Sequence, residues 1–161
     1  MVQARVRLTF PNTRQFMMET GSGHQLIIDD AVGQTGPKPI ELLAGALAGC
    51  TAFDVITFLR GKRHQNVTGY EVSVEADQRP APPQVFTTIH IHHIVTGHGI
   101  DPKAVEDGIR LSEDKYCSVG AMVRQSGSEI RTTYSIHDPQ EPLSGDVRTV
   151  EPVKLEPAKA N

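Results

Sequence analysis

Tryptophan is absent from this chain of 161 residues, and only two cysteines occur, Cys50 and Cys117. Two cysteines cannot build a disulfide framework, and without a C-x-x-C pair they lack the pattern of a zinc knuckle. The balance of 16 Lys and Arg against 19 Asp and Glu includes no basic stripe, so no nucleic-acid partner is expected. The segment after Met1 places Arg5 and Arg7 where a secretory signal would have its apolar core. We therefore expect a cytoplasmic protein with free thiols.

The length and composition predict a single domain. With 161 residues and 38% hydrophobic content, the chain can build one compact core and is too short for two. We assign residues 1–137 to this domain. Residues 138–161 hold four prolines and few large apolar groups, which predicts a peripheral C-terminal tail. Removing this tail should change the melting temperature little.

Alternation of apolar and polar residues predicts most of the remaining elements. Three short strands are expected near the N-terminus, followed by a helix, two long strands joined by a proline-rich loop, two helices and a final strand. This order indicates an α+β protein with helices against an antiparallel sheet. The expected ranges after the first helix are strands 68–77 and 85–95, helices within 100–126 with a break at 114–116, and strand 128–137; the early strands are 4–10, 14–20 and 24–30.

The segment 40–60 is the predicted central helix, with Glu41 and Asp54 as its acidic residues. Because it is apolar almost all round, we expect it to be buried on most faces. It is long enough to span a bilayer, but a mid-segment Asp54 is costly in lipid, so no membrane association is predicted. Gly45 and Gly49 are four residues apart, which predicts close contact with another helix.

The two thiols suggest redox chemistry. A thiolate can attack a peroxide O–O bond when a nearby cation or a helix N-terminus lowers its pKa. Cys117 stands at the start of a predicted helix, whereas Cys50 lies inside one and would need a charge from an arginine in the N-terminal strands. A second thiol can then capture the sulfenic acid as a disulfide, and an external dithiol can restore both. The alternative is that both cysteines pack as small hydrophobic residues.

Three segments together carry a family resemblance: "GPKPIELLAGALAGCTAFDVITFL", "VFTTIHIHHIVTG" and "LSEDKYCSVGAMV". Over residues 2–137 the chain resembles the OsmC/Ohr superfamily, and its OsmC-like branch most. The resemblance implies an OsmC-like α+β fold, in which antiparallel sheets wrap around a long buried central helix in an intertwined homodimer. It also implies reduction of organic or inorganic hydroperoxides without metal, haem, flavin or other cofactor. In this family pattern Cys50 would be the peroxidatic thiol and Cys117 the resolving one.

The resemblance further implies an Arg and a Glu that orient and activate the first thiol. The hydroperoxidases carry this Glu ten residues before the cysteine, whereas Glu41 is nine before Cys50. One residue rotates a helical side chain by about 100°, so Glu41 can point elsewhere. It can also be a first-turn carboxylate favoured by the helix dipole. Arg14 is the nearest candidate for the arginine, with Arg5 and Arg7 left open.

The run "HIHHIV" raises a metal hypothesis. Strand alternation places His90 and His92 on one face and His93 on the other. His98 or His137 could join the pair. The same run holds no carboxylate or thiol to complete a ligand set, so we expect exposed sheet histidines and no metal.

Three functional hypotheses follow from these residues. The favoured one is a cysteine-based hydroperoxide reductase, a peroxidase that takes organic hydroperoxides as substrates and an external dithiol as reductant. The second is a dimeric small-ligand-binding or redox-sensing OsmC-like protein without peroxide turnover, which the offset of Glu41 favours. The third is a structural or regulatory dimer with inert cysteines.

Overall fold

The computed structural model of the chain describes residues 1–140 and 146–151, and it forms two compact units. One unit runs to Gly45 and the other begins at Ala46. The division falls within the first helix, whereas the length of the chain predicted one compact unit.

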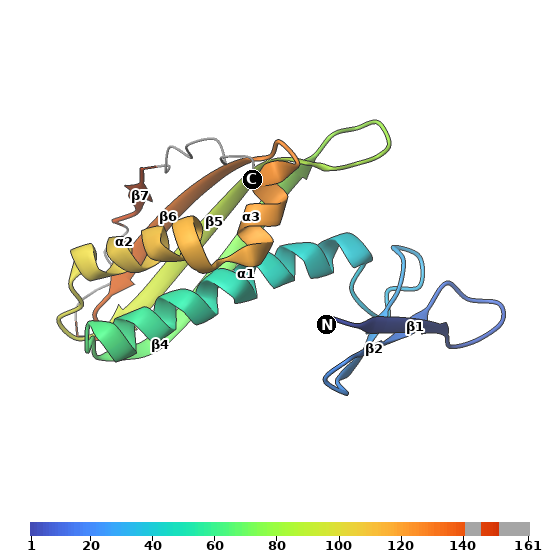
Figure 1. Cartoon of the computed structure of the whole chain (residues 1–161), viewed down its shortest axis with the longest axis horizontal. Coiled ribbons are helices and arrows are strands. Elements are labelled where there is room, and N and C mark those ends of the chain that lie inside the picture. The colour runs from blue at the N-terminus through green and yellow to red at the C-terminus, as the bar shows by residue number, and fades with distance from the viewer. Residues whose placement is uncertain (141–145, 152–161) are drawn as a thin grey trace. The chain divides into compact units, whose positions relative to one another are not determined.

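The first unit is a three-stranded antiparallel sheet with the strand order β1-β2-β3 (Figure 1). Gly23 has a φ of 84° in the turn between the second and third strands, a conformation that glycine adopts without steric cost. Ile28 and Asp29 are its buried residues. The three predicted early strands are confirmed as β1 (Ala4–Leu8), β2 (Phe16–Thr20) and β3 (Gln25–Ile28).

The first helix, α1 (Pro39–Thr57), continues into a π-helical turn, η1 (Phe58–Lys62). Pro39 fits the first helical position because its missing N–H has no intrahelical acceptor there. Residues four apart form the buried stripe of this helix. They are Leu47, Thr51, Val55 and Leu59.

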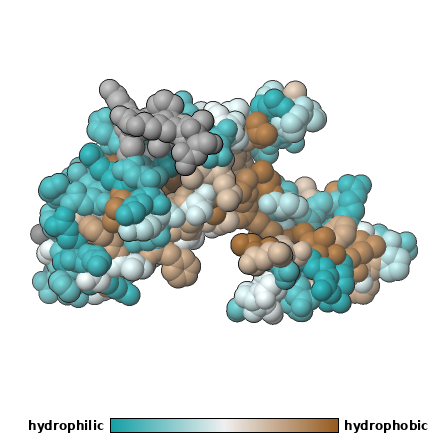
Figure 2. Space-filling model, viewed as in Figure 1, coloured by the Kyte–Doolittle hydropathy of each residue, from teal (hydrophilic) through white to brown (hydrophobic). Residues whose placement is uncertain are grey.

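The prediction that α1 is buried on most faces is wrong for the single chain. Phe53 is 77% exposed and Leu43 is 39% exposed. A Cβ at Gly45 or Gly49 would find no atom of the described residues within 4 Å, so the described residues make no close helix contact there, and the predicted contact stays a prediction for a homodimer. The described residues pack against one stripe of α1, which leaves apolar surface over the helix (Figure 2).

By length and composition, Pro39–Lys62 could cross a membrane. Asp54 lies near the middle of this segment and accepts a hydrogen bond from the buried Ser112. A carboxylate with a protein partner, together with the stripe that enters the core, favours a helix packed on protein over one in lipid.

The second unit contains a four-stranded sheet with the order β4-β5-β6-β7. The predicted hairpin and the predicted final strand are confirmed. However, β5 and β6 pair in parallel, so the sheet is mixed and not wholly antiparallel. The helices between these two strands form the crossover that a parallel pair requires. The strands are β4 (Val67–Gln78), β5 (Phe86–Gly97), β6 (Glu129–His137) and β7 (Arg148–Val150).

The crossover consists of α2 (Pro102–Leu111), a π-helical turn η2 (Ser112–Tyr116) and α3 (Ser118–Gln125). Asp101 caps α2 by accepting a hydrogen bond from the Lys103 amide at 2.9 Å. The predicted break at 114–116 lies within η2, and Cys117 is the N-cap residue of α3, as its position in the sequence indicated.

Helices α1 and α2 cover one face of this sheet, and the core of the second unit lies between the two layers (Figure 1). Side chains from both helices and all four strands meet there. They include Val55 of α1, Leu59 of η1, Val105 and Ile109 of α2, and Val67, Val95, Tyr134 and Val150 of the strands.

Part of the expected tail belongs to this core. Arg148–Val150 pairs with β6, and Val150 is only 3% exposed. This strand is therefore not peripheral, and a deletion from residue 138 would remove a buried side chain. The small change in melting temperature expected for that deletion does not follow from the structure. Residues 141–145 and 152–161 of the tail lie outside the described residues.

Candidate functional site

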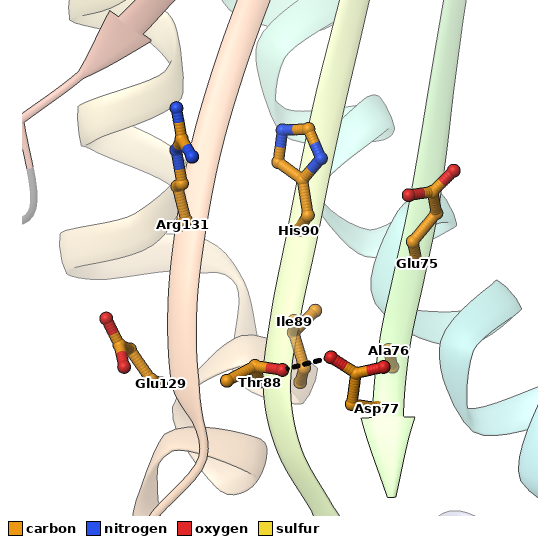
Figure 3. A pocket seen from close by; sticks show the side chains of 8 residues that line it. All are labelled: Glu75, Ala76, Asp77, Thr88, Ile89, His90, Glu129 and Arg131. Atoms are coloured by element: carbon orange, nitrogen blue, oxygen red, sulfur yellow. Dashed lines mark hydrogen bonds between the residues drawn. The ribbon is translucent and has the colours of Figure 1, made fainter.

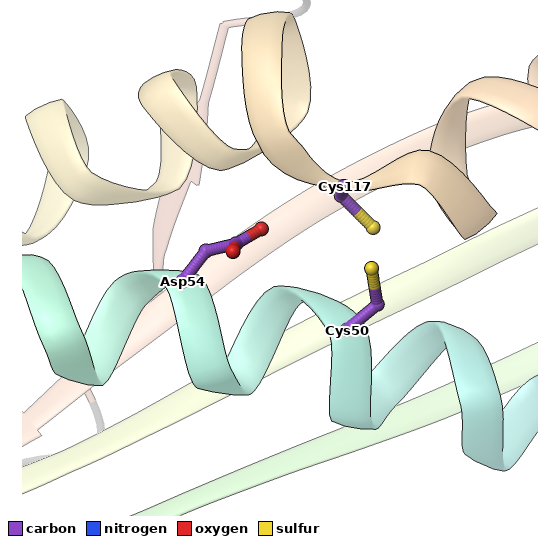
Figure 4. A group of neighbouring side chains, drawn as sticks. All are labelled: Cys50, Asp54 and Cys117. Carbon is purple, nitrogen blue, oxygen red and sulfur yellow. The ribbon is translucent and has the colours of Figure 1, made fainter.

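The two cysteines come together with a carboxylate in the second unit. Cys50 lies in the middle of α1, and Cys117 lies between η2 and α3. The two sulfur atoms and a carboxylate oxygen of Asp54 all lie within 4.8 Å of one another (Figure 4). The thiol groups point toward each other across the gap between the helices. Residues far apart in the sequence thus form one cluster of reactive side chains.

Local sequence explains this arrangement. Cys50 and Asp54 are four residues apart, which places both on the same face of α1. Gly120 allows α3 to approach that face, because a Cβ at this position would lie 3.1 Å from Cys117 Sγ and 3.6 Å from Leu47 Cδ1. The Gly120 amide also donates a hydrogen bond of 3.2 Å to Cys117 Sγ. A larger residue at 120 would therefore displace the second thiol.

The two thiols have different surroundings. Cys117 is 5% exposed, and burial raises its pKa well above the usual range, with Cys50 and Asp54 adding to the effect. The Gly120 amide lowers this pKa, but by less than burial raises it. The helix position of Cys117 therefore does not produce the lowered pKa that the sequence suggested. Cys50 is half-buried, so it is the more exposed of the two cysteines.

Asp54 is a residue that the sequence reasoning did not place in the site. Its Oδ2 accepts a hydrogen bond of 2.8 Å from Ser112 Oγ, and the Ser112 side chain is fully buried. The same hydroxyl lies 3.2 Å from Thr51 Oγ1. Asp54 is half-buried, and Ser112 is its hydrogen-bond partner. Its spacing of four from Cys50 is the signal that could have assigned it to the thiol cluster.

A cavity of about 300 Å³ lies beside this cluster and is lined in part by Asp54 and by its partner Ser112. Most of its other walls are apolar and come from Phe53, Phe58 and Leu111. A small molecule with an apolar body could therefore approach the cluster from this side.

Glu41 is held at the start of α1. Its carboxylate accepts a hydrogen bond of 2.8 Å from the Lys38 amide and pairs with Lys38 Nζ at 3.1 Å. The bond from the Lys38 amide lowers the pKa of Glu41. Nine residues of an ideal helix correspond to about 13.5 Å of rise and two and a half turns, which places positions 41 and 50 on opposite faces of such a helix. This arrangement fits a first-turn carboxylate, and its role in activating Cys50 stays a prediction.

The candidate arginines belong to the first unit. Arg14 lies after β1 and pairs with Asp30 at 3.3 Å. Arg5 and Arg7 lie on β1, where Arg7 pairs with Glu19. The assignment of Arg14 to the thiol site stays a prediction.

The histidines of β5 are half-buried or buried, not exposed. His90 Nε2 and His92 Nδ1 each lie 2.7 Å from Thr133 Oγ1. On the same face, Ser135 Oγ lies 3.3 Å from His92 Nε2 and 3.2 Å from His137 Nε2. These imidazoles are therefore joined through hydroxyl groups of the neighbouring strand.

His93 points to the opposite face, as the alternation predicted. It is completely buried, and its Nδ1 lies 2.6 Å from the Tyr70 hydroxyl. His98 lies apart from both groups and pairs with Asp138 at 2.9 Å. Among the described residues, the side chains that gather closely enough to hold a metal are those of the thiol cluster, and no histidine is among them.

A second cavity, of about 310 Å³, lies on the outer face of the sheet (Figure 3). Glu75, His90 and Arg131 stand side by side on β4, β5 and β6, as the strand register requires. Thr88 Oγ1 donates a hydrogen bond of 2.6 Å to Asp77 below them. The lining residues include no thiol, so the Cys50 cluster is the better candidate for redox chemistry.

Comparison with known proteins agrees with this geometry. A sequence model of the family described as OsmC-like protein matches residues 32–133, a span that includes both cysteines. The chain belongs to the OsmC-like protein family. This OsmC-like protein is 38% identical to the protein YhfA of Escherichia coli K12 over 125 residues, which are 78% of the chain and 91% of YhfA.

Solved structures show the same fold. A hypothetical protein from Aquifex aeolicus VF5 matches this OsmC-like protein with a TM-score of 0.77 and 25% identity, over 87% of the chain and 98% of the other. An organic hydroperoxide resistance protein OsmC from Legionella pneumophila matches with a TM-score of 0.57 and 15% identity, over 85% of this chain and 96% of the Legionella chain. The α+β, OsmC-like fold that the resemblance implied is therefore confirmed.

Proposed function

We propose that this OsmC-like protein is a cytoplasmic thiol-dependent peroxidase that reduces organic hydroperoxides through Cys50 and Cys117. The observation that carries the proposal is the facing pair of sulfur atoms, one half-buried and one buried, within 4.8 Å of each other. The organic hydroperoxide resistance protein among its structural neighbours supports the same class of reaction.

The difference between the two thiols supports a division of roles. Cys50 is the more exposed residue, so in this proposal its thiolate attacks one oxygen of the hydroperoxide, the O–O bond breaks, and the alcohol leaves after protonation. Cys50 is then a sulfenic acid. Cys117 attacks this sulfur, the S–S bond forms, and the hydroxyl group leaves as water. An external dithiol returns both sulfur atoms to thiols, so one hydroperoxide is reduced by two electrons in each cycle.

The surroundings of the thiols support an organic substrate. The apolar cavity of about 300 Å³ beside Asp54 can hold a hydrocarbon group while the peroxide reaches Cys50. Hydrogen peroxide gains nothing from such walls. We therefore infer that kcat/KM is higher for cumene hydroperoxide than for hydrogen peroxide.

The test is hydroperoxide consumption by the reduced protein, with a lipoyl dithiol protein or thioredoxin supplied as reductant. We expect multiple turnovers with at least one of them and a faster reaction with cumene or tert-butyl hydroperoxide than with hydrogen peroxide. If the hydroperoxide persists while both thiols stay free, the peroxidase proposal is wrong.

The open face of α1 supports a homodimer as the working form. Gly45 and Gly49 face open space, and Phe53 is 77% exposed, which is unusual for the longest apolar segment of a chain. A second copy that covers this face would give α1 the burial that its composition predicts.

Sedimentation velocity at micromolar concentration should therefore show a dimer. Phe53→Glu should shift the equilibrium toward monomer by at least about tenfold, because a charge would enter the covered face. Val85→Glu is the matched control, since Val85 is a 40% exposed residue in the β4–β5 loop. A wild-type protein that stays monomeric under these conditions would contradict the dimer.

The second candidate function is small-ligand binding or redox sensing without turnover. The observation that favours it is the engagement of Glu41 with Lys38, which leaves the activating carboxylate of the family pattern without a confirmed counterpart. In that case an apolar ligand would bind next to reduced thiols, and the consumption assay would show no turnover.

A further inference from the structure

We propose that Cys50, Asp54 and Cys117 of the reduced protein form a binding site for a thiophilic divalent cation of the Zn²⁺ type. The proposal rests on the three donor atoms that already lie within 4.8 Å of one another before any ion is added. Binding does not depend on peroxidase activity, whereas its regulatory consequence rests on the proposed function.

The donor set fits this class of ion. Two thiolates and one carboxylate are ligands that Zn²⁺ accepts, whereas Mg²⁺ and Ca²⁺ prefer oxygen alone. With Zn–S bonds of about 2.3 Å and tetrahedral angles, two coordinating sulfur atoms stand about 3.8 Å apart. The observed spread of 4.8 Å or less therefore requires side-chain movement of about 1 Å at most.

The positions of the donors are fixed by their surroundings. Cys50 and Asp54 are one turn apart on α1, so the helix backbone keeps their side chains on the same face. Cys117 accepts a hydrogen bond from the Gly120 amide, the type of contact that stabilises a metal-bound thiolate. Ser112 donates to Asp54 from a buried position and orients the carboxylate in the same way. Hydrogen bonds that orient the ligating groups in this way distinguish a built site from a chance cluster.

The site also has a route of entry. Cys50 is half-buried, and Asp54 lines the neighbouring cavity of about 300 Å³. Three protein ligands leave a fourth position for water, as in catalytic zinc sites. The site can therefore fill and empty without unfolding.

Metal binding and peroxide reduction would compete for the same sulfur atoms. A bound ion engages the lone pairs that attack the O–O bond, so it protects both thiols from oxidation. When a hydroperoxide does react, two thiolates lose two electrons and form the disulfide. The peroxide takes those electrons with two protons to give the alcohol and water, and the ion is released. Zn²⁺ would thus act as a reversible inhibitor of the proposed peroxidase.

The test is a titration of the reduced protein with Zn²⁺ against a chromophoric chelator, repeated with Co²⁺, whose visible spectrum reports tetrahedral thiolate ligation. We expect one ion for each chain and no binding after both thiols are joined as a disulfide. Cys50→Ser and Cys117→Ser should each weaken binding at least about a hundredfold, and Asp54→Asn about tenfold or more. The matched control is Glu71→Gln, which changes an exposed carboxylate of β4 in the same way.

Circular dichroism of each variant identifies any that fails to fold. If a cysteine variant fails to fold, Zn²⁺ binding is compared between Asp54→Asn and Glu71→Gln. The site is refuted if the wild type binds Zn²⁺ no more tightly than Cys50→Ser, or if Glu71→Gln weakens binding as much as Asp54→Asn. Binding without any peroxide turnover would support the site and remove the peroxidase proposal. Peroxide turnover that is insensitive to Zn²⁺, in a protein that binds no Zn²⁺, would refute the site and support the peroxidase proposal.

Discussion

We expect Cys50→Ser to lose hydroperoxide consumption by roughly three orders of magnitude or more, because the nucleophile is removed. Cys117→Ser should still permit one attack for each chain, since Cys50 is retained. Its oxidised product cannot be resolved as a disulfide, so Cys50 stays a sulfenic acid or passes to higher oxidation states. The two variants therefore differ in their products as well as in their rates.

Mass spectrometry after one equivalent of cumene hydroperoxide distinguishes these states. The wild type should lose two hydrogen atoms as the Cys50–Cys117 disulfide forms, and Cys117→Ser should gain one or more oxygen atoms. Ser118→Ala is the control, because Ser118 is an exposed neighbour of the second thiol. Retained activity in Cys50→Ser, with oxidation of Cys117, would reverse the proposed roles.

The raised pKa of Cys117 makes its attack on the Cys50 sulfenic acid more demanding than the first attack on the peroxide. A buried neutral thiol attacks slowly until it loses its proton. The Asp54 carboxylate lies within 4.8 Å of this sulfur and can accept that proton during the attack. Asp54→Asn should therefore slow disulfide formation in the reaction above more than it slows the first attack on the peroxide. This is why the sulfenic acid is expected to be detectable in that variant.

The sequence predicted the thiol pair and its two helices because these depend on local signals. The apolar run around Cys50 indicated α1, and the break before Cys117 indicated the turn η2. The family resemblance added that the two segments meet. Asp54 was left out because its partner, Ser112, lies far away in the sequence and only the folded chain shows the contact.

Other features could not be predicted because they depend on long-range pairing. Alternation indicates a strand but not its direction, so the parallel pairing of β5 with β6 was missed. Arg148–Val150 is too short for a periodic signal, and it becomes a strand only because β6 offers an edge. The apolar face of α1 predicted burial, but the sequence does not say that one chain covers only the stripe through Leu47 and Val55.

His93 should make the protein less stable as the pH falls from about 7 to 5. It is completely buried, and burial lowers its pKa from 6.5 to about 3, with His92 adding to the effect. Within the described residues, its Nε2 has no hydrogen-bond partner that could accept a proton from the charged ring. On the side of Nδ1 it meets Tyr70, whose pKa burial raises, so that hydroxyl stays neutral.

The direction of this pH dependence follows from the protonation of His93 in the folded and the unfolded chain. Below about pH 6.5 the unfolded chain binds a proton at His93, whereas the folded chain does not until about pH 3. The contribution of neutral His93 to the free energy of unfolding is therefore complete above pH 6.5 and declines as the pH falls toward 3. One pH unit corresponds to 1.36 kcal/mol, so the free energy of unfolding should fall by about 2 kcal/mol between pH 6.5 and 5. Asp29 and Asp30, whose pKa values are lowered, stay ionised in this window.

Urea unfolding at pH 7, 6 and 5 measures this slope, and His93→Gln should flatten it by most of that 2 kcal/mol. Glutamine stays neutral and can keep a hydrogen bond to Tyr70, so the comparison concerns the slope and not the absolute stability. His92, whose pKa is also lowered, retains a smaller slope of the same sign in the variant. His64→Asn is the control, since His64 is exposed. If His93→Gln keeps the full slope while His64→Asn removes it, the acid sensitivity does not come from the buried ring between the sheet and α1.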